Sequence, residues 1–216
     1  MSTGATGVFH PYALYLLTGP LLFQERSLGA VIEEALRAGV RMVQYRSKNL
    51  SPKDALAEAS GLRGLTRKYG AVLIVNDSVD LALAIGADGV HLGQEDLPLE
   101  IARKILGRTA VIGVSTHGAE EAKTAERGGA DYIGLGPIFA SSTKVSPQEP
   151  LGLEGIRRVR REVSLPIYAI GGITFERISE VMRSGADGVA AISALAGETG
   201  REVAKWLSEL AREGRR

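Results

Sequence analysis

The sequence predicts a parallel (β/α)8 barrel, the TIM-barrel fold of the α/β class, built as a single domain over residues 1–216. Short apolar runs rich in β-branched residues alternate along the chain with longer segments of helical period. A glycine-containing repeat at 38–40, 86–90, 129–133 and 185–189 closes a helix and opens a strand each time. A length of 216 residues lies near the lower end of the range for one such barrel.

The expected strands read as near-continuous apolar runs, which is typical of strands buried on both faces. In chain order they are Ala13–Thr18, Arg41–Arg46, Val72–Asn76, Gly89–Leu92, Val111–Ser115, Tyr132–Leu135, Ile167–Ile170 and Gly188–Ile192. The clearest amphipathic helices span about 53–69 and 119–127. We expect an N-terminal extension over about 1–12. The longest loop, over about 137–150, follows the sixth strand on the rim where barrel active sites gather.

Composition excludes several classes of function. The formal net charge is only +1, from 26 basic and 25 acidic residues, so no global field attracts nucleic acid or an anionic membrane. The chain has no cysteine, which excludes disulfides and thiol catalysis. The first apolar run, 13–17, is too short for a membrane span. We therefore expect a cytoplasmic protein that binds small molecules, with neither nucleic acid nor membrane as partner and with its oligomeric state left open.

Polar side chains occur where the expected strands end, on one rim of the barrel. After the second strand, Gln44 and Arg46 share one side and point inward, with Lys48 reaching in from the turn. A solvated turn with one ion pair is the simpler interpretation of these three residues taken alone. Asp77 and Asp96 end the next two strands, and two carboxylates near cations suit a magnesium ion clamped onto phosphates. Either Asp could instead cap a helix.

The remaining strand ends add further polar candidates for the site, and two of their turns suit a phosphate. Glycine turns and helix N-termini after the seventh and eighth strands of barrels often bind phosphate, although a tight turn without a ligand is the alternative. The candidates are Asn76, Ser115, Ser141, Ser142, Thr143, Lys144, Gly172, Ile192 and Ser193. For His91 we expect a packed or hydrogen-bonded role rather than catalysis, and His117 on the rim stays open.

Seven motifs in order resemble those of the thiamine-phosphate synthase family. They are 44–48 (QYRSK), 75–77 (VND), 89–96 (GVHLGQED), 113–117 (GVSTH), 134–139 (GLGPIF), 143–144 (TK) and 169–173 (AIGGI). The family joins an aminopyrimidine methyl diphosphate to hydroxyethylthiazole phosphate with magnesium as cofactor, releasing diphosphate and forming thiamine phosphate. The resemblance therefore implies a transferase of thiamine biosynthesis.

The resemblance also implies a role for each matching residue. Gln44, Arg46, Lys48, Asn76 and Lys144 would hold the pyrimidine diphosphate, Asp77 and Asp96 the Mg²⁺ ion, and Ser115 would lie against the pyrimidine. Ser141, Ser142, Thr143, Gly172, Ile192 and Ser193 would hold the thiazole phosphate. The expected catalytic residues are Arg46, Lys48, Lys144 and Ser115. The three cations would stabilise the negative charge that grows on the departing diphosphate.

One departure and several alternatives remain. Ala140-Ser141 stands where the family commonly has Pro-Thr, which keeps the hydroxyl but loses a rigid proline. The related thiazole tautomerase shares the fold but needs no metal-diphosphate site. A sugar-phosphate epimerase or aldolase needs an acid/base pair or a Schiff-base lysine, for which Lys48 or Lys144 is the candidate. A sensor of thiamine precursors, without catalysis, is the alternative outside enzymes.

Overall fold

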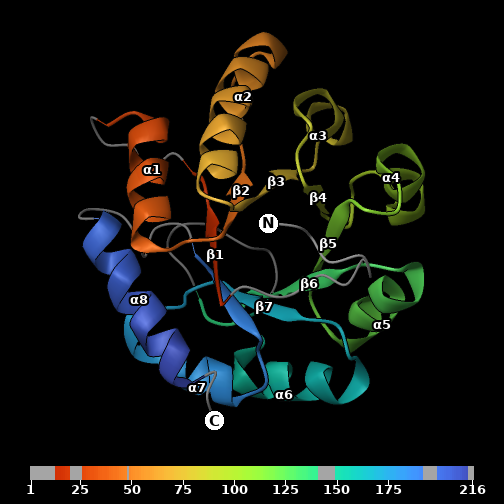
Figure 1. Ribbon diagram of the computed structural model, residues 1–216. Coiled ribbons are helices and arrows are strands. Elements are labelled where there is room, and N and C mark those ends of the chain that lie inside the picture. Colours follow the sequence, from red (N-terminus) through yellow and green to blue (C-terminus); the bar gives the residue numbers. More distant parts are fainter. Residues whose placement is uncertain (1–12, 20–25, 48, 141–148, 192–198, 214–216) are drawn as a thin grey trace.

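The computed structural model describes residues 13–19, 26–47, 49–140, 149–191 and 199–213, which form a closed barrel of parallel strands in sequential order. Figure 1 looks along the barrel, with the helices surrounding the strands. The strands are β1 Leu14–Leu17, β2 Met42–Tyr45, β3 Val72–Asn76, β4 Gly89–Leu92, β5 Val111–Thr116, β6 Tyr132–Leu135, β7 Ile167–Ile170 and β8 Gly188–Ala191. The predicted fold class is confirmed, and each predicted strand is found with bounds that agree within one residue.

The helices alternate with the strands as the sequence predicts. They are α1 Leu28–Ala38, α2 Pro52–Lys68, α3 Val79–Ile85, α4 Leu99–Leu106, α5 Ala119–Gly128, α6 Gly152–Glu162, α7 Ile178–Arg183 and α8 Thr199–Glu213, with a short 3-10 turn η2 Phe175–Arg177 before α7. The barrel closes where β1 pairs with β8, and α1 and α8 lie side by side outside this seam (Figure 1). Among the described residues, no helix has the length and apolar character that crossing a membrane requires.

The predicted glycine repeat marks the ends of four helices. Gly39, Gly86 and Gly129 cap α1, α3 and α5 in the left-handed region, with φ of 116°, 59° and 83°. Gly185 follows α7 with φ of 106°. A residue without a Cβ adopts this conformation without steric cost, so the chain turns from helix into strand within a few residues.

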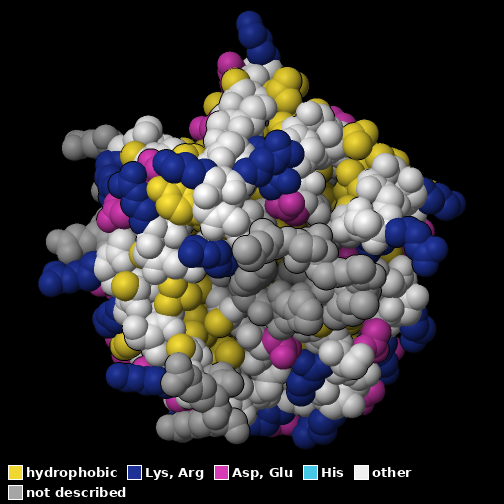
Figure 2. Space-filling model, viewed as in Figure 1, with side chains coloured by type: hydrophobic (Ala, Val, Ile, Leu, Met, Phe, Trp, Pro, Cys, Tyr) yellow, Lys and Arg dark blue, Asp and Glu magenta, His cyan; other side chains and the backbone are white. Residues whose placement is uncertain are grey.

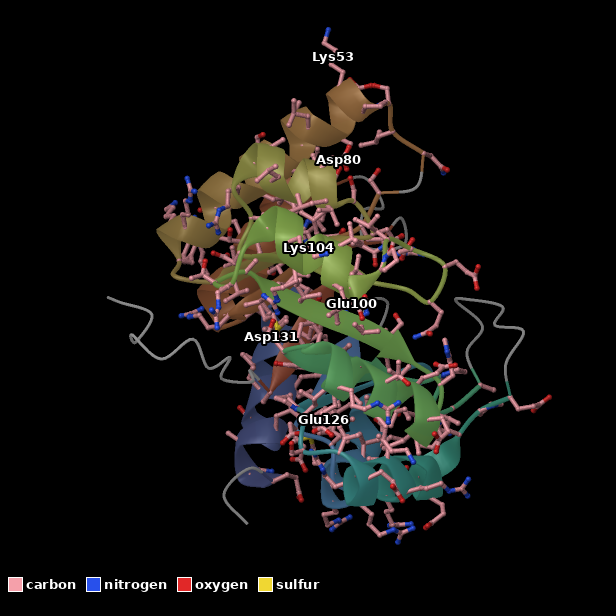
Figure 3. The ribbon with its side chains drawn as sticks, turned by 90° about the vertical axis from the view of Figure 1, so that its right-hand side faces the viewer. Lys53, Asp80, Glu100, Lys104, Glu126 and Asp131 are labelled. Carbon is pink, nitrogen blue, oxygen red and sulfur yellow. The ribbon has the colours of Figure 1, made fainter. Side chains whose placement is uncertain are left out.

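The aspartates of the same repeat clamp the end of the barrel where the strands begin. Asp88 binds the Arg63 guanidinium through two hydrogen bonds of 2.6 and 2.9 Å and accepts the Leu73 N–H of β3 at 2.8 Å. Two further aspartates make equivalent contacts. Asp131, before β6, binds Arg103 of α4 and accepts the Ile112 N–H of β5. Asp187, before β8, binds Arg160 of α6 and accepts the Ile167 N–H of β7. Asp131 is labelled in the side view of Figure 3. The end of the barrel opposite the rim is thus held by repeated charged clamps.

The barrel interior holds a small core separate from the layer between strands and helices. Tyr15, Met42, Ile74, Tyr132 and Tyr168 pack there. The three tyrosine rings meet edge to face with centroids 5.3 to 5.7 Å apart. A buried hydroxyl requires a hydrogen-bond partner, so this aromatic core also brings polar groups into the barrel.

Candidate active site on the carboxyl-terminal rim

The structure brings five of the predicted site residues to one rim of the barrel. Gln44, Asn76 and Ser115 are near the carboxyl ends of β2, β3 and β5, while Asp77 follows β3 and Asp96 lies in the loop after β4. These four strands are neighbours in the barrel (Figure 1). Other candidates, Lys48, Ser141, Ser142, Thr143, Lys144, Ile192 and Ser193, lie outside the described residues, and their roles stay predictions.

Gln44 points into the barrel, as strand alternation predicts. Its side chain is 2% exposed, and its amide nitrogen donates to the Tyr15 hydroxyl at 2.7 Å. Arg46, two residues on, is half-buried, and its N–H donates to the Thr18 hydroxyl at 2.8 Å. Thr18, directly after β1, therefore holds the backbone at Arg46, where the chain leaves β2.

His91 lies inside the barrel below the rim, where both ring nitrogens are engaged. Nδ1 is 3.0 Å from the Tyr132 hydroxyl and Nε2 is 2.9 Å from the Ser115 hydroxyl. Burial lowers the pKa of His91 to about 4, against the opposing effect of the nearby Asp96 charge. The imidazole is therefore neutral near pH 7, and the predicted hydrogen-bonded role is confirmed.

Asp77 has a left-handed backbone, with φ of 64°, which is uncommon for a residue other than glycine. Its N–H donates to the His91 carbonyl at 2.9 Å, so the turn is fixed against β4. The cap of α3 is Ser78, whose side chain accepts from the Leu81 N–H. Helix capping therefore does not explain Asp77, and a strained conformation at a strand end is typical of functional sites.

Asp96 folds back over the end of β4. Its Oδ2 accepts the Gly93 N–H at 2.6 Å, while Pro98 occupies the cap position of α4, so helix capping does not explain Asp96 either. The same loop is tied to β5, because the Gln94 amide nitrogen donates to the Ser115 carbonyl at 2.6 Å. Asp96 and Asp77 thus sit on adjacent strand ends, each held by a hydrogen bond to the backbone.

Two carboxylates on one rim fit a magnesium ion better than a metal held wholly by protein. Within the described ranges, no group of three or more His, Cys, Asp or Glu side chains could hold a metal. Magnesium retains several waters and typically takes one or two carboxylates together with substrate phosphate oxygens. Asp77 and Asp96 are therefore compatible with an ion that arrives with a diphosphate.

The turn after β7 packs directly on the start of the predicted long loop. Gly171 and Gly172 have φ of 98° and 61°. A Cβ on Gly172 would lie 2.5 Å from the Ala140 carbonyl oxygen, and the Arg177 guanidinium stacks on the Phe139 ring at 4.1 Å. Gly172, a predicted phosphate ligand, thus lies against Phe139 and Ala140, the last described residues before the predicted ligands Ser141, Ser142 and Thr143.

A groove of about 370 Å³ lies outside the barrel mouth, between α3 and α4, and is lined by Asp77, Ser78, Val79, Asp80, Leu83, Leu97 and Ile105. Figure 2 shows apolar side chains gathered over these helices. Of the described rim candidates, only Asp77 borders this groove. Its largely apolar walls are unsuited to a diphosphate, so the polar strand ends are the better candidate site.

His117, left open by the sequence, belongs to the start of α5. Its N–H and its Nδ1 both lie within hydrogen-bond distance of the Glu121 carboxylate, at 2.8 and 2.9 Å. Sequence reasoning missed a different group, the interior tyrosines Tyr15 and Tyr132, which connect to Gln44 and His91. A tyrosine within an apolar strand was the available signal, because its hydroxyl must find a partner when buried.

Known proteins resemble this chain over most of its length. A family model described as thiamine monophosphate synthase matches residues 14–195. A thiamine-phosphate synthase of Chloroflexus aurantiacus is 50% identical over 184 residues, which cover 85% of each chain. One from Halalkalibacterium halodurans is 47% identical over 86% of this chain and 88% of its own. A solved thiamine phosphate pyrophosphorylase from Pyrococcus furiosus is 38% identical, with a TM-score of 0.84 over 93% of this chain and 96% of that one.

Proposed function

Because the chain belongs to the thiamine monophosphate synthase family, we propose that its rim joins 4-amino-2-methyl-5-(diphosphomethyl)pyrimidine to hydroxyethylthiazole phosphate. The chain is a transferase of thiamine biosynthesis, and the products of the proposed reaction are thiamine phosphate and diphosphate. One observation supports the proposed site above all. Gln44, Asn76, Asp77, Asp96 and Ser115 lie together at the ends of four neighbouring strands.

The proposed chemistry places opposite charges at two parts of the rim. As the bond between the pyrimidine methylene carbon and the diphosphate oxygen breaks, negative charge grows on the diphosphate and positive charge on the methylene. Arg46, Lys48 and Lys144 would stabilise the first charge, since preorganised cations act where charge develops. Magnesium, when bound by Asp77 and Asp96, would supply further neutralisation of the diphosphate.

No general base is needed in this reaction. The thiazole nitrogen that forms the new bond to carbon has a lone pair and carries no proton to lose. The site agrees with this chemistry, because His91, buried below the rim, is neutral and has both ring nitrogens occupied. His91 is therefore unsuited to proton transfer with the thiazole.

The two substrates would occupy different parts of the rim. Gln44, Asn76 and Ser115 are proposed to contact the pyrimidine diphosphate, on the β2 to β5 side. Backbone groups after β7 and β8 would bind the thiazole phosphate, as turns of this type do in other barrels. The proposed phosphate ligands are Ser141, Ser142, Thr143, Gly172, Ile192 and Ser193.

Diphosphate release tests the proposal directly. The purified protein is mixed with both phosphorylated precursors in Mg²⁺, and then with a chelator, while diphosphate and thiamine phosphate are measured. Release that requires both substrates and the metal, with the two products in equal amounts, is the expected result. Binding of thiazole phosphate without release would instead favour the tautomerase or the sensor, and would leave Asp77 and Asp96 without a role.

A further inference from the structure

A chain of buried hydrogen bonds crosses the barrel interior from Gln44 on β2 to Ser115 on β5. The Gln44 amide nitrogen lies 2.7 Å from the Tyr15 hydroxyl, which lies 2.8 Å from the Tyr132 hydroxyl. Tyr132 in turn lies 3.0 Å from His91 Nδ1, and His91 Nε2 lies 2.9 Å from the Ser115 hydroxyl. Two residues proposed to contact the same substrate are thus connected through groups that do not themselves reach the rim.

The number of hydrogens available determines the direction of the chain. Each hydroxyl has one hydrogen to donate, and a neutral imidazole has one N–H and one bare nitrogen. Gln44 presents its NH2 group to Tyr15, so the Tyr15 hydrogen is directed to Tyr132 and the Tyr132 hydrogen to His91 Nδ1. His91 then carries its hydrogen on Nε2 and donates it to Ser115.

We infer that His91 and Tyr132 are positioning residues that fix the Ser115 hydroxyl as a hydrogen-bond donor to the substrate. Because Ser115 accepts from His91 Nε2, its own hydrogen is left for another acceptor. A ring nitrogen of a pyrimidine is such an acceptor. The identity of this ligand rests on the proposed function. The polarity of the hydrogen-bond chain, meaning which group donates to which, rests on the protein alone.

The opposite polarity has a structural cost. If Ser115 donated to His91, then His91 Nδ1 would donate to Tyr132, and Tyr132 to Tyr15. The Tyr15 hydroxyl would then accept hydrogen bonds from both Gln44 and Tyr132. Its own buried hydrogen would have no acceptor in this series of hydrogen bonds. An unsatisfied buried donor costs more than a hydrogen bond returns, so reversal requires the Gln44 amide to turn over.

The interior is shaped to accommodate this chain. A Cβ on Gly113 of β5 would lie 2.0 Å from the Tyr132 ring, and one on Gly134 of β6 would lie 3.1 Å from His91 Cε1. Each ring therefore occupies space that a glycine on another strand of the barrel leaves open. The Tyr15 and Tyr132 rings also pack edge to face at 5.7 Å, which holds their hydroxyls in place.

Nitrogen-15 NMR of histidine-labelled free protein near pH 7 tests the polarity, because protonated and bare ring nitrogens have distinct shifts. We expect His91 to show a protonated Nε2 and a bare Nδ1. In Tyr132→Phe, which removes the donor to Nδ1, we expect that tautomer to lose its dominance. A protonated Nδ1 in the wild-type protein, or a doubly protonated ring, would overturn the inference.

Steady-state kinetics test the consequence for the substrate. In Tyr132→Phe we expect KM for the pyrimidine diphosphate to rise roughly 3- to 10-fold, the worth of one buried hydrogen bond, with kcat and KM for the thiazole phosphate within about twofold. Tyr45→Phe is the comparison variant, since Tyr45 also has a buried ring, but its hydroxyl donates to Glu58 at a partly buried position outside the barrel. Equal KM values in the two variants would contradict the inference.

Tyr15→Phe interrupts the series of hydrogen bonds at a second point, near Gln44, and can be used if Tyr132→Phe does not fold. It should also weaken the His91 tautomer preference, because Tyr132 loses the hydrogen-bond donor that directs its own hydrogen to His91. An unchanged tautomer there would count against the chain as a whole. Absence of thiamine phosphate synthesis in the wild-type protein would refute the proposed function without altering the tautomer result.

Discussion

Replacing Gly172 by alanine should separate the turn after β7 from the segment that begins the long rim loop. Gly172 has φ of 61°, and a Cβ there would lie 2.5 Å from the Ala140 carbonyl oxygen and 2.8 Å from Phe139 Cβ. Real Cβ atoms do not approach backbone so closely, so one of the two segments must move. Since Gly172 is itself a proposed ligand of the thiazole phosphate, the movement should weaken binding of that substrate as well as stability.

Gly70→Ala is the matched control. Gly70 also has φ of 61°, but a Cβ there would meet nothing within 4 Å. Alanine in the left-handed region costs about 1 kcal/mol in both variants, whereas forced overpacking adds about 2 kcal/mol in Gly172→Ala only. For a chain of this size, that difference lowers Tm by roughly 4 to 8 °C relative to Gly70→Ala.

Thermal unfolding of the two variants, followed by circular dichroism, measures the difference in stability. Steady-state kinetics should show a raised KM for the thiazole phosphate in Gly172→Ala and a wild-type value in Gly70→Ala. If both variants lost the same stability, close packing against Ala140 would not be the reason for glycine at 172. If KM for the thiazole phosphate stayed unchanged despite lost stability, this turn would be structural and the phosphate would bind elsewhere.

Three further substitutions test other parts of the structure. Asp77→Asn removes the charge but keeps a residue that tolerates φ of 64°. Magnesium-dependent diphosphate release should fall at least about tenfold, with Tm unchanged. Wild-type activity in this variant would show that Asp77 is not a metal ligand. Asp88→Asn should cost about 1 to 2 kcal/mol in urea unfolding because it weakens the Arg63 clamp, whereas Glu154→Gln, on the exposed surface, should be indistinguishable from wild type. Gly113→Ala should prevent correct folding, seen as loss of soluble protein, because its Cβ would overlap the Tyr132 ring.

The fold could be predicted nearly in full because its signals are local. A strand buried on both faces is apolar along its whole length, and a helix that ends in a left-handed glycine gives a recurring motif such as Gly86-Ala87-Asp88. Strand ends were shifted by at most one residue, for example Thr116 in place of Ser115 at the end of β5. The final hydrogen bond of a strand depends on its neighbour, which is not a local property.

The rim candidates could be predicted because parallel strands all end on the same side. Position after a strand was enough to select Asp77, Asp96 and Ser115. The connection from Gln44 to Ser115 could not be predicted, since it depends on register between strands that are distant in sequence. Gly113 lies opposite Tyr132 only because β5 and β6 pair in that register, and no feature within either strand indicates it.

The aspartates of the chain show how position in a barrel separates stability from function. Asp88, Asp131 and Asp187 precede strands, and at that end each is bound by an arginine and a strand N–H. Asp96 follows a strand, and the rim instead holds its carboxylate with the Gly93 N–H, a neutral donor that leaves the negative charge in place. An arginine at that position would neutralise the charge that a cation needs. Charge paired with arginine therefore stabilises the fold at one end of the barrel, while the charge of Asp96 at the other end, held by a backbone N–H, fits its proposed role as a magnesium ligand.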